Sequence, residues 1–121
     1  MKREMDLIRL LLLQVETGEV PPGLDQFSED VQGYHGALLV EAGLVQGKAV
    51  SVGGGRKGAV ITGLTWAGHD FLDAARSDTV WNKAKEKVLK PGLSWTFSML
   101  LEVLKAEARA QLLKHGLLPP E

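Results

Sequence analysis

The 121-residue sequence contains no cysteine, which excludes disulfide bonds, thiolate zinc sites and cysteine nucleophiles. It also lacks an apolar run of about 18 residues, the length at which a helix becomes a candidate to span a membrane. The most apolar stretch, residues 7–13, is short and carries Arg9. Glu4 and Asp6 interrupt any signal-peptide pattern at the N-terminus. We therefore expect a cytoplasmic protein without a membrane partner.

No charge of one sign dominates the chain, because its net charge at pH 7 is -1. The charges are unevenly distributed, however, with a net charge of -4 over residues 1–79 and +3 over residues 80–121. Because no basic field covers the whole surface, any binding of nucleic acid must come from local basic patches. The apolar content of 45% is sufficient for a core, so we expect one domain over residues 1–116 and a disordered tail at residues 117–121.

Hydrophobic periodicity predicts two helices in the first third of the chain. The first covers about residues 5–17, and Gly18 stands where helices commonly end. The second covers residues 28–42, with Ser28 as its N-cap and Gly43 at its C-terminal end. Its predicted inward stripe comprises Val31, Tyr34, Leu38, Leu39 and Ala42.

A β-hairpin and three further helices are predicted next. Residues 44–52 and 59–64 have the alternation and the Val and Ile content of strands, and the turn between them is a long, flexible, glycine-rich tip. Helices over residues 65–76, 78–89 and 94–116 begin at Thr, Asp and Ser, which are suitable caps. The inward stripe of the last helix comprises Phe97, Leu100, Leu101, Leu104, Ala108 and Leu112.

This order of elements is typical of a winged helix-turn-helix. We expect an α+β, mainly helical fold, with a winged helix-turn-helix core, a β-hairpin wing and two additional C-terminal helices. Residues 21–27 leave little room for the separate helix that winged-helix regulators usually place before the recognition helix. Winged helices bind DNA, dock proteins or dimerise, so the fold alone does not decide the function.

Several sequence blocks resemble a bacterial and phage-associated family, domain of unknown function 2513. The blocks are residues 1–9, 34–35, 41–45, 64–73 and 78–83, in the same order as in the family. The resemblance implies a winged-helix fold and a prophage-like context. The family provides no activity or catalytic residues that would apply to this chain.

The hairpin tip, residues 53–58, has the spacing G-x-G-x-x-G of dinucleotide-binding loops. In those loops the motif leads into a helix, whereas residues 59–62 are strand-like. The tip also fails the P-loop pattern, because Ala59 occupies the position of the required Lys. We therefore interpret it as a turn and expect no cofactor.

The helix in the recognition position has unusual composition for a DNA reader. It contains three acids and no Lys or Arg, while major-groove readers favour Arg, Lys, Asn and Gln. Gln32 and His35 are its only side chains suited to base contacts. Gly33 and Gly36 leave one surface bare, which suggests close approach of another backbone, in the core or at an interface.

Candidate nucleic-acid contacts therefore lie mainly elsewhere. Lys48, Arg56 and Lys57 lie on the hairpin, and Lys83 and Lys87 lie on the lysine-rich helix after Trp81. A solvated basic turn and a solvated helix account for the same residues. For the lysine-rich helix, that alternative is favoured, with Val80, Trp81, Ala84 and Val88 facing inward.

His69 and Asp73 are four residues apart, a spacing that can bind a metal, but two ligands do not make a site. We expect a structural histidine with Asp73 as its partner, no metal and no enzymatic activity. The leading hypothesis is a prophage-type DNA-binding regulator or accessory factor that binds double-stranded DNA through its basic wing. The alternative is a protein-interaction or dimerisation module without nucleic-acid binding.

Overall fold

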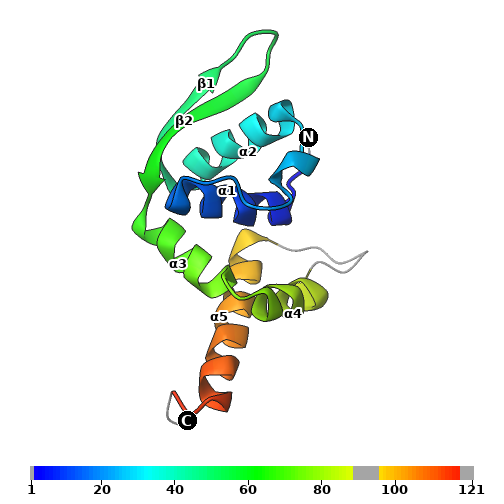
Figure 1. Ribbon diagram of the computed structural model, residues 1–121, viewed down its shortest axis with the longest axis vertical. Coiled ribbons are helices and arrows are strands. Elements are labelled where there is room, and N and C mark those ends of the chain that lie inside the picture. Colours follow the sequence, from blue (N-terminus) through cyan, green and yellow to red (C-terminus); the bar gives the residue numbers. More distant parts are fainter. Residues whose placement is uncertain (1, 89–95, 118–121) are drawn as a thin grey trace. The chain divides into compact units, whose positions relative to one another are not determined.

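The computed structural model describes residues 2–88 and 96–117. It is an α+β, mainly helical chain with one two-stranded antiparallel sheet, as predicted (Figure 1). The elements in order are α1 (Met5–Thr17), the 3-10 helix η1 (Leu24–Gln26), α2 (Glu29–Glu41), β1 (Val45–Ser51), β2 (Lys57–Leu64), α3 (Trp66–Ala75), α4 (Asp78–Val88) and α5 (Phe97–Lys114). The chain divides into two compact units, Met1–Leu72 and Asp73–Glu121, and the predicted single domain stays a prediction.

Helix α1 has the predicted bounds. Leu7 and Leu12 are completely buried, and Gly18 ends the helix in the left-handed conformation, with φ of 75°. The connection to α2 contains only the three-residue η1, so the expected lack of room for a further helix is confirmed. Ser28 caps α2 as predicted, because its hydroxyl oxygen accepts a hydrogen bond from the Val31 N–H at 3.2 Å.

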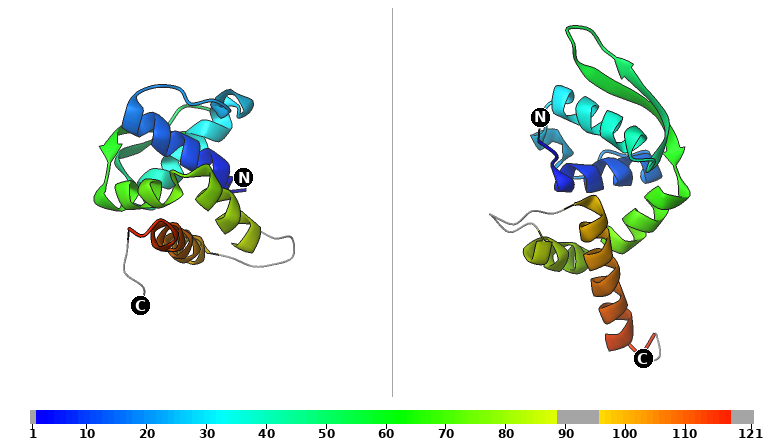
Figure 2. Two further views of the ribbon diagram at one scale, coloured as in Figure 1. Left: turned by 60° about the horizontal axis from the view of Figure 1, so that its bottom comes forward. Right: turned by 180° about the vertical axis from the view of Figure 1, so that it is seen from behind.

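Helix α2 contacts both α1 and the hairpin, and the right-hand view in Figure 2 shows β1 and β2 running along it. The predicted inward stripe of α2 is partly wrong. Its buried residues are His35, Gly36, Ala37 and Leu39, whereas Ala42 is exposed. The error arises because two elements cover the helix, and small residues face the hairpin where periodicity anticipated one continuous apolar stripe.

The bare face of α2 contacts β2, which confirms the expected close approach of another backbone. A Cβ added at Gly33 would lie 2.7 Å from the carbonyl oxygen of Lys57, and one added at Gly36 would lie 3.4 Å from the Cβ of Ala59. Real Cβ atoms do not approach a backbone oxygen this closely, so glycine at position 33 lets the strand lie on the helix. Strand β2 begins two residues before the prediction, since Lys57 already pairs with Ser51.

The C-terminal helices agree with the predicted pattern in most respects. Phe71, Leu72 and Ala75 of α3 are buried, as are Val80, Trp81, Ala84 and Val88 of α4. Ser77, not the predicted Asp78, caps α4, because its hydroxyl oxygen accepts from the Val80 N–H at 3.3 Å.

Helix α5 begins after Thr96, whose hydroxyl oxygen accepts from the Met99 N–H at 3.2 Å. The predicted break at residues 91–92 and the predicted start at Ser94 lie outside the described residues, as do residues 118–121 of the predicted tail. In the predicted stripe of α5, Leu100 and Leu104 are buried, but Leu112 is exposed and Glu107 is buried. None of the described helices is long and apolar enough to cross a membrane.

Candidate functional site

The hairpin tip is a defined turn rather than a loose loop. Gly53, Gly54 and Gly55 all have positive φ, between 60° and 94°, which L side chains rarely adopt. The N–H of Arg56 donates to the carbonyl of Gly53 at 3.0 Å, and the N–H of Val52 donates to the carbonyl of Arg56 at 3.1 Å. The three glycines therefore serve a turn, as predicted, but the hydrogen-bonded turn is shorter than the long tip predicted over residues 53–58, because Lys57 already belongs to β2.

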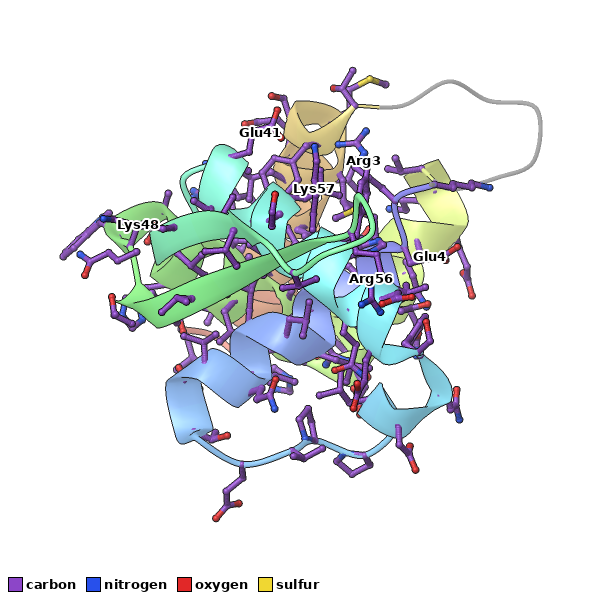
Figure 3. All side chains as sticks on the ribbon, turned by 90° about the horizontal axis from the view of Figure 1, so that it is seen from above. Arg3, Glu4, Glu41, Lys48, Arg56 and Lys57 are labelled. Atoms are coloured by element: carbon purple, nitrogen blue, oxygen red, sulfur yellow. The ribbon has the colours of Figure 1, made fainter. Side chains whose placement is uncertain are left out.

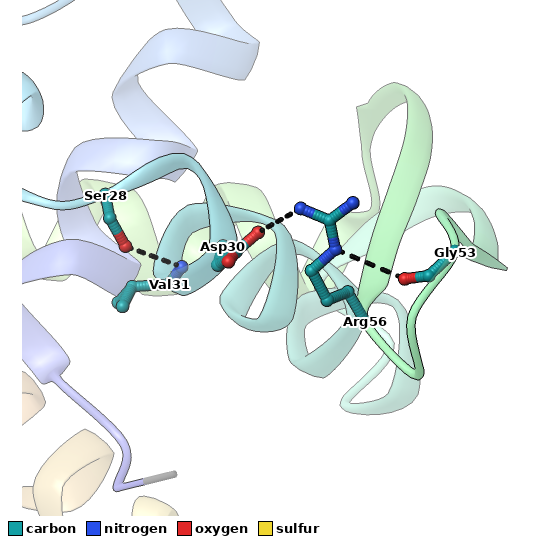
Figure 4. A network of polar contacts seen from close by, with 5 residues as sticks. All are labelled: Ser28, Asp30, Val31, Gly53 and Arg56. Carbon is teal, nitrogen blue, oxygen red and sulfur yellow. Dashed lines mark hydrogen bonds and ion pairs between the residues drawn. The ribbon is translucent and has the colours of Figure 1, made fainter.

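The side chain of Arg56 turns back toward α2 (Figure 4). Its Nε donates to the carbonyl of Gly53 at 3.2 Å, and its Nη1 lies 3.3 Å from Oδ1 of Asp30. Both side chains of this ion pair are 56% exposed, so water and salt weaken it. The pair nevertheless joins one of the predicted DNA-contacting cations to an acid of the neighbouring helix.

The outer face of the hairpin is apolar near its tip. Ala59 and Ile61 face α2, so the alternation of side chains directs Val60 away from it, and Val60 is 60% exposed. Lys48 pairs directly with Val60 and shares this face. A Cβ added at Gly58 would lie 3.1 Å from Val52 Cγ1 and 3.8 Å from Val50 Cγ2. Glycine at position 58 therefore gives Val52 room to lie over β2, whereas the distance to Val50 is an ordinary contact.

We define the valine face of the hairpin as Val50, Val52 and Val60, together with Lys48. Val52 is 51% exposed, and none of the described elements hides it from solvent. The hairpin, residues 45–64, has three cations and no acid. Figure 3 shows Lys48 well apart from Arg56 and Lys57, so the three cations do not converge on one point.

Two predicted base-contacting side chains have internal partners instead. His35 is completely buried; its Nε2 accepts from the N–H of Glu4 at 2.9 Å, and its Nδ1 lies 2.8 Å from the carbonyl of Val31. The neutral ring with hydrogen on Nδ1 satisfies both contacts. A side chain with no exposed surface offers nothing to a ligand, so the prediction for His35 is wrong.

Gln32 forms hydrogen bonds with the loop that precedes α2. Its Nε2 donates to the carbonyls of Leu24 and Phe27, at 3.1 Å and 2.9 Å. The residues of α2 that are exposed are Glu29, Asp30 and Glu41, all of them acidic. The fully exposed side chains of this helix are thus all carboxylates, which a phosphate-lined groove repels.

On α4, the solvated-helix interpretation agrees with the structure. Lys83 and Lys87 are exposed, and the Nζ of Lys87 forms a short ion pair with Glu107 of α5. The Nζ of Lys85 lies 5.8 Å from the ring centroid of Trp81, within the range of a cation–π contact. Two of the lysines of this helix are thus engaged within the protein.

His69 is exposed, and Asp73 pairs with Arg76 at 2.9 Å, so the predicted His69–Asp73 partnership is not formed. Among residues 2–88 and 96–117, no three His, Asp or Glu side chains are placed to hold a metal ion.

The comparisons with known proteins agree with the sequence blocks. The family model described as "Hypothetical protein (DUF2513)" matches residues 2–94. The chain belongs to this family. A Haemophilus influenzae protein, named as an uncharacterized protein, is 34% identical over 110 residues, which cover 85% of this chain and 92% of that protein. No solved structure matches.

Membership of the DUF2513 family assigns no role to any residue, so the site is argued from its geometry. Sequence reasoning missed the valine face and the exposure of Trp66, which is 84% exposed at the start of α3. The spacing of Lys48, Val50 and Val52 was a usable signal, because residues two apart in a strand share one face. The sequence did not show which of the two faces of the hairpin α2 covers.

Proposed function

We propose that this protein is a protein-binding module that docks its partner on the valine face of the hairpin. The observation that carries the proposal is the exposure of Val52 and Val60 on one face of a two-stranded sheet. Contiguous exposed apolar residues on a soluble protein are typical of interaction sites. Trp66 directly follows the hairpin, and tryptophan is enriched among residues that dominate binding energy.

The charge of the hairpin specifies the chemistry of the partner. Lys48 lies on the valine face, and Arg56 and Lys57 lie at the tip, with no acid between residues 45 and 64. A complementary partner is a protein segment that carries apolar side chains between carboxylates. Such a segment buries the valines and neutralises the surrounding cations.

Nucleic-acid binding, in a winged-helix frame with a prophage context, is the second candidate. The same three cations and the absence of an acid in the hairpin favour it. Three cations alone give weak binding that falls steeply with salt. The acidic surface of α2 makes this candidate less favourable than a protein partner.

The test begins with selection of peptides that bind the full chain from a displayed random library. We expect the selected peptides to combine acidic and apolar residues, and to perturb backbone amides of residues 45–64 in two-dimensional NMR spectra. Peptides that perturb only other residues, or a failure to select any binder, would refute the proposal.

A pair of isosteric substitutions makes the test specific. Val60→Thr replaces a methyl that the bound peptide would bury by a hydroxyl, which costs about 1 kcal/mol of binding free energy and weakens peptide binding about fivefold. Val20→Thr is the matched control, because Val20 is 67% exposed and lies in the loop after α1. Duplex DNA followed by fluorescence anisotropy distinguishes the second candidate, since its binding depends on salt and is insensitive to Val60→Thr.

A further inference from the structure

Helix α5 has a second apolar face besides the one it buries. Leu100, Leu104 and Glu107 form the buried face. A different set of side chains repeats at alternating spacings of four and three residues along the helix. It comprises Met99, Val103, Ala106, Ala110 and Leu113, which we call the α5 seam.

The α5 seam is open to solvent. Met99 is 49% exposed and Leu113 36%, Ala106 and Ala110 are exposed, and Val103 is half-buried. At 3.6 residues per turn, the seam lies roughly a third of a turn around the helix from the buried face. A seam with spacing 4-3-4-3 is the pattern by which two helices pack along their length.

We infer that the α5 seam is the interface of a homodimer in which two copies of α5 pack antiparallel. The inference is independent of the proposed partner site, because the seam lies in the unit Asp73–Glu121 and the hairpin in the unit Met1–Leu72.

Side-chain size favours a second copy in this orientation. In an antiparallel pair centred between residues 104 and 105, Met99 of one copy faces Ala110 of the second, and Val103 faces Ala106. Both of these layers then join a large side chain to a small one, and Leu113 lies opposite Thr96, the N-cap of the second helix. Alanines at the centre permit close approach of the two helices, as interdigitating helix surfaces require.

Charge selects the orientation. The same antiparallel register sets Glu102 of each copy beside Arg109 of the other, which gives two opposite-charge pairs. Arg109 also has an interaction within its own chain, and the dimer contact adds to it. A parallel pair would instead set Arg109 beside Lys114, which carry like charges, and would set Glu102 beside no opposite charge, because Glu107 is buried and paired with Lys87 of its own chain. Only the antiparallel dimer is complementary.

One helix per copy gives a small interface, below about 1,200 Å² in total, so we expect a dissociation constant on the order of 10 µM. Sedimentation equilibrium of the full chain between about 1 and 200 µM measures it. Ala106→Arg is expected to weaken dimerisation more than tenfold. Ala67→Arg is the matched control, because Ala67 is also an exposed helical alanine, and it should leave the dimer unchanged.

A charge exchange tests the orientation. Glu102→Arg weakens an antiparallel dimer, and the double variant Glu102→Arg with Arg109→Glu restores it to within about threefold of the original. In a parallel dimer, Glu102 would not lie beside Arg109, so the double variant would not restore the association that the single variant changes. Circular dichroism of each variant shows whether the fold is retained, and the rescue by the double variant excludes simple misfolding.

Because the chain has no cysteine, introduced thiols report on the seam alone. An oxidised mixture of Val103→Cys and Ala106→Cys should yield mainly the mixed disulfide dimer. A monomer at 200 µM, a dimer that tolerates Ala106→Arg, a stronger dimer with Glu102→Arg, or mainly same-variant disulfides would each overturn the inference.

Discussion

Replacing Gly33 by alanine tests whether the backbone of β2 lies directly on α2. The new Cβ would lie 2.7 Å from the carbonyl oxygen of Lys57 and 3.4 Å from the Cα of Gly58. Both are backbone atoms, so the hairpin itself must shift. Such overpacking costs about 1–3 kcal/mol, and the better helix propensity of alanine returns about 1 kcal/mol. We expect a net loss of about 1 kcal/mol in the free energy of unfolding.

Gly36→Ala is the matched control and is expected to act in the opposite direction. Its Cβ would lie 3.4 Å from the Cβ of Ala59 and 3.8 Å from Cδ1 of Ile61, which are ordinary contacts with side chains. Because no clash offsets the better helix propensity of alanine, the free energy of unfolding should rise by about 1 kcal/mol. The two substitutions, one turn apart on one helix, should therefore differ by about 2 kcal/mol.

Urea titration followed by far-ultraviolet circular dichroism measures this difference, provided that both variants unfold with the same m value. Amide chemical shifts of residues 57–59 supply a local readout, and they should change more in Gly33→Ala than in Gly36→Ala. If Gly33→Ala is as stable as Gly36→Ala, the close approach of β2 to α2 is wrong.

Three further substitutions test single contacts by the same titration. His35→Phe keeps an aromatic ring, although a larger one, and leaves the N–H of Glu4 without its acceptor, so it should cost about 2 kcal/mol; no loss would mean that the contact is absent. Ser28→Ala removes the cap of α2 and should cost about 1 kcal/mol, with its effect confined to amides of the first turn. Lys87→Met leaves the buried carboxylate of Glu107 unpaired and should cost about 1–3 kcal/mol, whereas Lys83→Met, the exposed control, should change stability by less than about 0.5 kcal/mol.

Local sequence signals predicted the elements well where the cause of the structure is itself local. The bounds of α1 and the cap at Ser28 follow from a periodic apolar run and from one side chain that bonds three residues ahead. The start of α4 was predicted only to within one residue. Ser77 and Asp78 are both suitable caps, and Ser77 caps the helix in the structure. Neighbouring caps differ by only a few tenths of a kcal/mol, so packing decides between them.

Contacts between distant segments were not predictable in this way. His35 and Glu4 are 31 residues apart, and no periodicity relates a ring nitrogen to a backbone N–H at that separation. The valine face depends on which side of the hairpin α2 covers, and that choice is made by Gly33 and Gly36 on another element. The sequence identified the bare surface that Gly33 and Gly36 leave on α2, but only the packing shows that β2 covers it.

The position of α2 limits what the predicted recognition helix can do. A hairpin of two strands is marginally stable alone, so β1 and β2 depend on α2, and α2 cannot leave them without exposing Ala59 and Ile61. The surface of α2 around Gly33 and Gly36 therefore packs on β2 and is not available to a ligand. The fully exposed side chains of α2 are carboxylates, one of which already pairs with Arg56. Helix α2 thus acts as a support for the hairpin, and the binding that we propose for this unit uses the outer side of the strands that α2 supports.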